Sequence, residues 1–338
     1  MDPSLSWSNK SLQIVCSTLI PSFDQLIGGG FAVSSLNVID EDCDRIYSSM
    51  LTKAYISSAI IANQRVIIFS SSIKTKNARF LKELPVQSAV NDYEEKTPNT
   101  DDALKIAFRY SNLPSYPSGD VSATVRLDFG NNIDASVLEN ASVDFYEHSD
   151  IISILENLIS STNIKSNVCR ILIDQIDSPL STLSVSQLPK IFHRIKVLIR
   201  QLPNSVCLAT LSSDRCNKTF NYGLLETISP SIRNRIHVLS DCVVRLIGFD
   251  EDENDNNPYS ADYVGFLHLL RLPRLNSLAP YNPTLEATEF GIKLRNSKRY
   301  LTIEKLALPP DLGETVNRFT SSVQVTDNKS CSKTFVNF

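Results

Sequence analysis

The sequence has 338 residues, of which 42% are hydrophobic and 21% charged, and its formal net charge at pH 7 is −4. This is the composition of a folded globular protein, with enough chain for one large domain or two small ones. The acidic balance excludes a protein that coats nucleic acid through overall positive charge, so any such contact has to come from a local basic patch.

The cysteines indicate a reducing compartment. There are seven, an odd number, and none forms a CxxC pair, which argues against a disulfide framework and against a structural zinc site. Four of them lie in apolar runs, where cysteine behaves as a small core residue; they are Cys16, Cys169, Cys207 and Cys242. We therefore expect neither a metal nor a cofactor.

The chain shows no membrane or secretion signal. No apolar run approaches the roughly 18 residues that a membrane helix needs. The first residues include Asp2, and Lys10 is followed by a polar, broken segment, which differs from a secretory signal peptide. These features predict a protein of the cytoplasm and nucleus.

Short, continuously apolar runs predict the strands. Continuous runs are typical of strands buried on both faces, as in a parallel sheet. Because helix-like segments separate most of them, they predict an α/β domain. In chain order the runs are Leu36–Ile39, Val66–Ser70, Val143–Tyr146, Ile171–Asp174, Val206–Leu211 and Val243–Ile247.

Three segments have the apolar periodicity of helices. Ile46–Ala62 and Asp150–Ser161 come first, and Ser186–Leu202 has the clearest pattern. In this last helix Ile191, Ile195, Leu198 and Leu202 fall on one face. Basic side chains occupy the opposite face; they are Lys190, His193, Arg194, Lys196 and Arg200.

Polar stretches predict the loops and the domain limits. Thr75–Asp101, Leu113–Asp120 and the acidic run Asp250–Asn257 are weakly patterned and are expected to be loops. We predict an N-terminal extension over residues 1–14, one domain over residues 15–313, and a disordered tail over residues 314–338.

The segment Pro21–Gly30 (PSFDQLIGGG) predicts a short helix or turn that leads through three glycines into a buried strand. RecA-type ATPase domains enter their phosphate loop in this way. Taken alone, the glycines are better explained as a simple flexible turn, and they become informative only beside the residues that follow. In a working loop the strand is followed by GxxxxGK[ST], whose backbone and lysine hold the phosphates and whose hydroxyl binds magnesium.

The eight residues at that place are Glu41 to Ser48 (EDCDRIYS). Glu41 and Ile46 replace the two glycines, Tyr47 replaces the lysine, and Ser48 alone fits the pattern. Acidic side chains at positions 40, 41, 42 and 44 would face a polyanion with only Arg45 to offset them, at ~1–4 kcal/mol for each close like-charge pair. The lost lysine removes roughly 1.5–3 kcal/mol more. The sequence therefore predicts a degenerate loop that does not bind ATP tightly.

Arg170–Asp177 (RILIDQID) is an apolar strand that ends in an acid. It resembles a Walker B strand, whose carboxylate holds magnesium, with Asp174 as the match. An Asp that only caps the end of a buried strand is the alternative, and without the upstream lysine we expect no catalytic role for Asp174.

The order of five segments along the chain resembles the PAXNEB family of Elongator proteins. The most specific are DYVGFLHLLRLPRLNSL (262–278) and KRYLTIEKLALPPDLGETVNR (298–318), in which strands run into Leu-Pro motifs. The others are PSFDQLIGGGFAV (21–33), IYSSMLTKAYI (46–56) and LKIAFRY (104–110). The resemblance spans about residues 21–318.

This resemblance implies a RecA-like fold, mostly parallel, with a degenerate phosphate loop. It also implies a hetero-hexameric ring with Elongator proteins 5 and 6, which docks on the larger Elongator subunits, binds tRNA and supports modification of the wobble uridine to a 5-carboxymethyl-type side chain. The radical chemistry belongs to another subunit, because this chain has no cysteine cluster for an iron–sulfur site.

Loops with cations and aromatic side chains are the candidates for RNA contact, since such loops suit unpaired bases and phosphates. The loop after Val206–Leu211 carries Arg215, Lys218, Phe220 and Tyr222, and a second group contains Arg271 and Arg274, with Arg295, Lys298 and Arg299 nearby. The basic face of Ser186–Leu202 is a third candidate. Each of the three is also explained by an ordinary solvated surface, and the helix face also by an acidic neighbouring subunit.

Three alternatives remain open on the sequence alone. The chain could be an independent RecA-like ATPase, which residues 41–48 oppose. It could be a ring scaffold that never contacts RNA. It could also act in transcription elongation.

Overall fold

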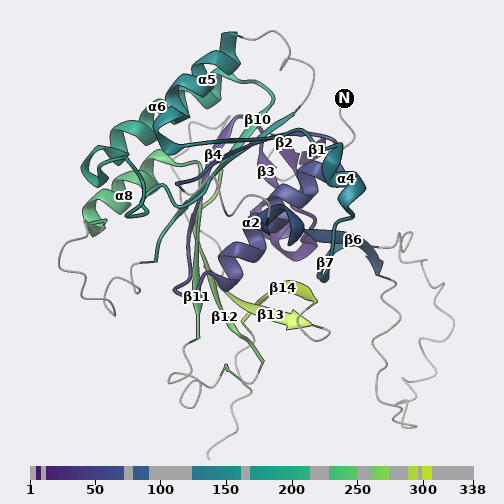
Figure 1. Cartoon of the computed structure of the whole chain (residues 1–338). Coiled ribbons are helices and arrows are strands. Elements are labelled where there is room, and N and C mark those ends of the chain that lie inside the picture. Colours follow the sequence, from purple (N-terminus) through teal and green to yellow (C-terminus); the bar gives the residue numbers. More distant parts are fainter. Residues whose placement is uncertain are drawn as a thin grey trace, which may run out of the picture. The chain divides into compact units, whose positions relative to one another are not determined.

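The centre of the computed structural model is a large β-sheet (Figure 1). The structure describes residues 5–8, 13–71, 79–90, 124–160, 168–213, 228–249, 259–260, 262–273, 288–295 and 299–306. Within these ranges the largest sheet has nine strands in the order β14-β13-β12-β11-β4-β10-β9-β5-β8. In that order the strands are Tyr300–Lys305, Glu289–Arg295, Gly265–Arg271, Cys242–Gly248, Ser35–Asp40, Ser205–Leu211, Cys169–Ile173, Arg65–Phe69 and Val143–Tyr146.

The strands from β11 to β8 are all parallel, and β12, β13 and β14 extend the sheet in antiparallel fashion. The predicted α/β domain with a mostly parallel sheet is thus confirmed. Each of the apolar runs named above falls in one of the parallel strands. The reason is burial on both faces: all seven residues of β10 are buried.

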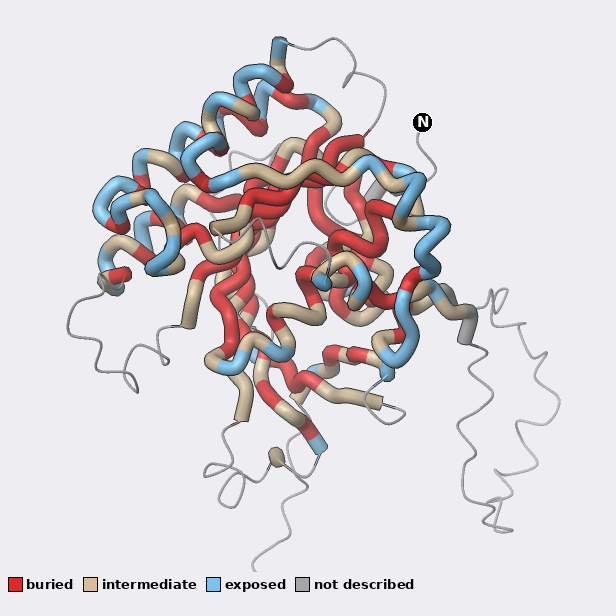
Figure 2. Tube along the Cα trace, in the orientation of Figure 1, coloured by how far each residue is buried: buried red, intermediate tan, exposed pale blue. Residues whose placement is uncertain are grey.

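Alternate side chains of the parallel strands point into two separate cores. Ile171 and Ile173 of β9 pack with the helices α5, α6 and α8, whereas Leu172 packs on the other face with α2. Figure 2 shows the buried strands between these layers and the exposed outer sides of the helices. The helices are α2 (Ile46–Ile61), α5 (Ile151–Ser160), α6 (Leu188–Gln201) and α8 (Pro230–Leu239).

The three predicted helices are confirmed, with ends that differ by one or two residues from the expected bounds. Short 3-10 turns, η2 (His148–Asp150) and η4 (Val185–Gln187), precede α5 and α6. Helix α2 is buried over most of its surface, because the sheet covers one side and smaller elements cover the other.

The N-terminal part adds a second, small sheet. Its strands are β1 (Leu5–Ser8), β2 (Gln13–Cys16) and β3 (Phe31–Ala32), so the predicted extension contains a paired strand. Helix α1 (Pro21–Ile27) and the three glycines follow the predicted order. The glycines are required: Gly30 has φ 134°, and a Cβ there would lie 2.3 Å from the carbonyl oxygen of Cys16.

One loop prediction is wrong. Within Thr75–Asp101, residues Pro85–Val90 form β6, which pairs antiparallel with β7 (Thr124–Asn132). A two-stranded pair needs only a short and weak apolar pattern, here PVQSAV, which local periodicity does not distinguish from a loop. The short helix α4 (Ala135–Glu139) follows β7.

Several predictions fall outside the described residues: the loops Leu113–Asp120 and Asp250–Asn257, the segment LKIAFRY (104–110) and the tail 314–338. Every described residue belongs to one compact unit, residues 1–306. No helix among the described ranges has the length and apolarity needed to cross a membrane. The four cysteines of the apolar runs are buried, as predicted.

Candidate functional site

The turn between β4 and α2 contains the segment Glu41 to Ser48, which the sequence predicts to be a degenerate phosphate loop. The buried Asp42 carboxylate accepts hydrogen bonds from the backbone N–H groups of Ile46 (2.7 Å), Tyr47 (3.2 Å) and Ser48 (2.9 Å). A helix N-terminus attracts anions because its first N–H groups lack partners within the helix. Asp42 therefore places a carboxylate of the chain itself against the N–H groups that could otherwise bind an anion.

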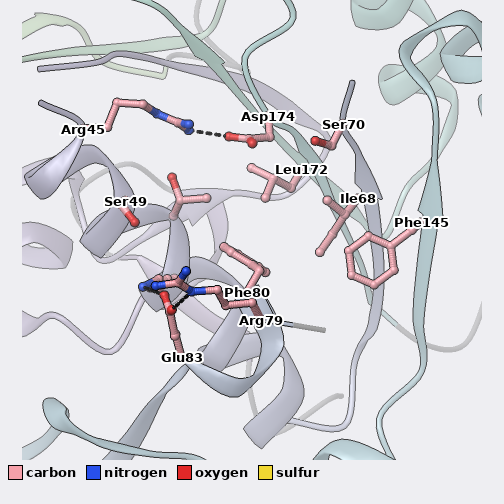
Figure 3. Close-up of a pocket in the computed structure, with 12 residues that line it drawn as sticks. Arg45, Ser49, Ile68, Ser70, Arg79, Phe80, Glu83, Phe145, Leu172 and Asp174 are labelled. Atoms are coloured by element: carbon pink, nitrogen blue, oxygen red, sulfur yellow. Dashed lines mark hydrogen bonds and ion pairs between the residues drawn. The ribbon is translucent and has the colours of Figure 1, made fainter. Parts of the chain in front are cut away.

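Arg45 begins α2 from a left-handed conformation, φ 55°. Its guanidinium donates a hydrogen bond of 3.0 Å to Glu41. It donates a second one, of 2.8 Å, to Asp174 (Figure 3). Asp174, which the sequence predicts as the Walker B match, thus pairs with a guanidinium of the chain itself. Among the described residues, no cluster of His, Cys, Asp or Glu has the arrangement of a metal site.

Glu41 stands where the first glycine of the motif would be, and only 1% of it is exposed. Burial raises its pKa to about 7, against the opposing effects of Arg45 and of the hydrogen bond from Gln175. That bond, 2.9 Å from Gln175 Nε2, connects Glu41 to the turn after β9. Glu41 is therefore about half protonated near pH 7.

The remaining motif positions also differ from a nucleotide site. Ile46 is exposed. Tyr47, at the position of the lysine, donates its hydroxyl to the carbonyl of Val264 (3.1 Å), beside the start of β12. Ser48 is fully buried, and its hydroxyl has no partner among the described residues. The side chains at 46 and 47 supply no group that would bind phosphate.

Asp40, the last residue of β4, is the centre of a charge cluster that sequence reasoning missed. It is 2% exposed and accepts hydrogen bonds from Arg233 (3.2 Å), His237 (3.0 Å) and Arg245 (3.1 Å). Burial opposes ionisation of Asp40, but the bond from His237 and the charges of the two arginines outweigh it, so its pKa lies below the ordinary value. Asp40 thereby joins β4 to α8 and β11.

A cavity of about 460 Å³ lies beside Asp174, at the carboxyl ends of β5 and β9 (Figure 3). Ile68, Phe80, Phe145 and Leu172 form its apolar wall. The basic residues that line it already have acidic partners: Arg45 has Asp174, while Lys53 and Arg79 both bind Glu83, at 2.9 and 2.8 Å. Sequence patterns contain no signal for this cavity, because its walls come from segments far apart in the chain.

Most of the candidates for RNA contact lie outside the described residues: Arg215, Lys218, Phe220, Tyr222 and Arg274. Arg271 is described, and its guanidinium donates to the carbonyls of His237 and Val238 at the end of α8. Cations stabilise helix C-termini in this way. Arg295 and Arg299 bind Glu304 and Asp128. RNA contact by these residues stays a prediction.

The basic face of α6 divides into two parts. Arg194 pairs with Glu156 of α5 (2.6 Å), and Lys196 and Arg200 pair with Asp241 (3.1 and 2.8 Å). Lys190 and His193, in the first turns of the helix, are exposed. For the later part of the helix the acidic partners thus come from the chain itself, whereas pairing of this face with an acidic neighbouring subunit stays a prediction.

Comparison with known sequences gives a match to the PAXNEB protein family over residues 2–338. The human protein named Elongator complex protein 4 is 28% identical in an alignment that covers 92% of this chain and 80% of the relative. The mouse protein of the same name is 30% identical, with 92% and 81% covered.

Among solved structures, a DnaB-like replicative helicase, described with its interactions with primase, aligns with a TM-score of 0.49 at 11% identity. The alignment covers 85% of this chain and 61% of the helicase chain.

Proposed function

Because the chain belongs to the PAXNEB protein family, we propose that it is a non-catalytic subunit of the Elongator complex. The observation that carries this proposal is the extent of the match to proteins named Elongator complex protein 4, which reaches 92% of this chain and about four fifths of each relative. A match of that extent includes the strands after β11 as well as the parallel core.

The strand order supports the RecA-like fold that the resemblance implies. β4 and β9, which lead to the phosphate-loop turn and to Asp174, lie on either side of β10 and are parallel. Their carboxyl ends therefore meet at one edge of the sheet, and Arg45 reaches Asp174 there. An ATP site needs its phosphate loop and its magnesium carboxylate in this relation.

The absence of catalysis is supported by hydrogen bonds within the chain that use the polar groups of the turn. The Asp42 carboxylate accepts hydrogen bonds from the N–H groups at the start of α2, and Arg45 donates one to Asp174. A phosphate would have to displace one carboxylate and approach two more. Each close pair of like charges costs ~1–4 kcal/mol. We expect no affinity of the isolated protein for ATP tighter than about 1 mM, or about −4 kcal/mol.

Calorimetry with ATP and magnesium tests this part. Micromolar binding that Ser48→Ala abolishes would contradict it and would show that the chain has its own nucleotide site.

The ring and its partners are the next part of the proposal. The chain is expected to assemble with Elongator proteins 5 and 6 into a mixed hexamer that docks on the larger Elongator subunits, in the cytoplasm and nucleus. Purification of the native protein followed by mass spectrometry tests it. A stable monomer that ignores both partners in sedimentation would contradict it.

Within that ring we propose tRNA contact through the loop that carries Arg215 and Lys218, in support of wobble-uridine modification. Each phosphate contact adds about −0.7 to −0.9 to the slope of log affinity against log salt. Replacing both residues with alanine should therefore lower the slope by roughly 1.5 for each copy engaged. Affinity should fall similarly for all tRNAs, because phosphate contacts position RNA without reading its sequence.

The measurement is tRNA binding by the assembled ring over a salt series, with hexamer formation as the control. An unchanged slope at full affinity would show that this loop is solvated surface, and the chain would then be a scaffold without RNA contact. Defects in transcription that persist when tRNA modification is restored would favour the transcription alternative.

A further inference from the structure

A groove of about 560 Å³ lies between α6 and α8. Its walls are Pro189, Lys190 and His193 from the start of α6, and Arg235, Val238 and Leu239 from the second half of α8. The groove is separate from the phosphate-loop turn, since the two share no lining residue. The function proposed above does not involve this groove.

The charge of the groove is unbalanced. Neither α6 nor α8 contains an acidic residue. Lys190, His193 and Arg235 are exposed, and no acidic side chain of the described ranges lies within ion-pair distance of them. The rest of the basic face of α6 is neutralised by Glu156 and Asp241. Uncompensated cations are therefore concentrated in the groove.

An apolar side chain lies among these cations. Val238 is 69% exposed, on a helix whose other outward residues include Asn234 and Arg235. A single exposed valine is ordinary on a protein surface. Here it lies in a concave surface beside half-buried Leu239, so a ligand that enters the groove removes apolar area from water.

We propose that this groove binds a short acidic segment of a partner protein. Carboxylates of the segment pair with Lys190 and Arg235, and an apolar side chain between them covers Val238. Charge complementarity requires an anionic ligand, and the exposed valine favours a peptide over nucleic acid. A phosphate group offers no apolar surface for Val238, and the described residues that line the groove include no Phe, Tyr or Trp on which bases could stack.

The test uses the full chain and three fluorescent probes in polarisation titrations. The first is a peptide in which glutamates flank two leucines, the second has glutamine in place of each glutamate, and the third is a single-stranded RNA oligonucleotide of the same charge as the first. We expect the glutamate peptide to bind, the glutamine peptide to bind more weakly, and added salt to weaken the first alone.

Lys190→Glu and Arg235→Glu should each lower affinity for the glutamate peptide roughly fivefold, because an exposed ion pair is lost and a repulsion replaces it. Lys82→Glu is the matched control, since Lys82 is also exposed and the net charge changes equally. Val238→Ser should weaken both peptides and leave the salt dependence unchanged.

The proposal is overturned if the wild-type chain does not bind the glutamate peptide, or if Lys82→Glu has the same effect as Lys190→Glu. It is also overturned if the RNA probe binds more tightly than the glutamate peptide and is released by the same two variants, because the groove would then be a nucleic-acid site.

Discussion

In the turn after β4, the buried charged groups are matched from within the chain: Asp40 by Arg233, His237 and Arg245, and Glu41 by Arg45. In the groove between α6 and α8, Lys190 and Arg235 have no acidic partner among the described residues. A buried charge has to be matched for the fold to be stable, whereas an exposed charge does not. A buried charge with a partner therefore indicates a structural role, whereas an exposed charge without a partner leaves a surface that a ligand can bind.

The largest effect is expected where two arginines and a histidine surround one acid. Asp40→Ala leaves Arg233 buried without its carboxylate, and such a loss costs about 3–5 kcal/mol. Urea unfolding of the purified chain measures it. Asp44→Ala is the control, because Asp44 is an exposed acid of the same turn, and it should change stability by less than about 0.5 kcal/mol. Equal effects of the two variants would contradict the claim that Asp40 is a structural centre.

Glu41 gives the matched region a pH dependence. Its pKa is raised to about 7 in the folded chain, from 4.5. A raised pKa means that the folded state binds the proton more tightly, so this contribution is fully present below pH 4.5 and is lost as the pH rises through 7. Burial of the charged form should cost on the order of 2–3 kcal/mol by pH 8.

Glu41→Gln removes that titration. The unfolding free energy of this variant relative to the wild type should therefore rise between pH 5 and pH 8. Asp24, whose pKa is raised to about 6 mainly by burial, titrates in both proteins and cancels in the comparison. A difference that stays constant with pH would show that Glu41 ionises freely.

The start of α2 should show a smaller effect. Asp42→Ala removes the acceptor of three backbone N–H groups, and loss of a helix cap costs about 1–2 kcal/mol. The exposed N–H groups then form an open anion site. Phosphate should raise the unfolding midpoint of Asp42→Ala more than chloride does at equal ionic strength, and should leave the wild type unchanged. Equal responses of the two proteins would show that Asp42 does not occupy a phosphate position.

The sequence predicts the parallel sheet well because burial on both faces produces apolar runs that a local pattern can reveal. It predicts α6 for a similar reason, since one buried face imposes the helical period. The missed strand β6 has no such run, and β7 alternates apolar and polar residues instead of forming one. Partners within the candidate site were missed for another reason: Arg45 and Asp174 are 129 residues apart, and Asp40 and Arg233 are 193 apart.

The sequence also indicates correctly that acids cluster in the turn, but it treats them only as mutual repulsion. In the folded chain Asp42 faces backbone N–H groups and Asp40 faces arginines, so the same carboxylates hold the turn together. Local charge counting cannot show this, because the compensating groups arrive through the topology of the sheet.

The smallest effect separates the two parts of the α6 surface directly. Arg200→Ala removes a partner of Asp241, which is 7% exposed in its side chain, so it should destabilise the chain by about 0.5–1 kcal/mol. Lys190→Ala removes a cation that has no acidic partner and lies near two other basic groups, so stability should stay equal or rise by a few tenths of a kcal/mol. Both substitutions delete one exposed positive charge from the same helix, which makes each the control for the other.

Urea unfolding at low and at high salt measures both variants. The loss of stability in Arg200→Ala should shrink at high salt, because salt screens the lost ion pair. A penalty for Lys190→Ala as large as that for Arg200→Ala would mean that Lys190 has a partner within the chain, and the contrast between the turn and the groove would then fail.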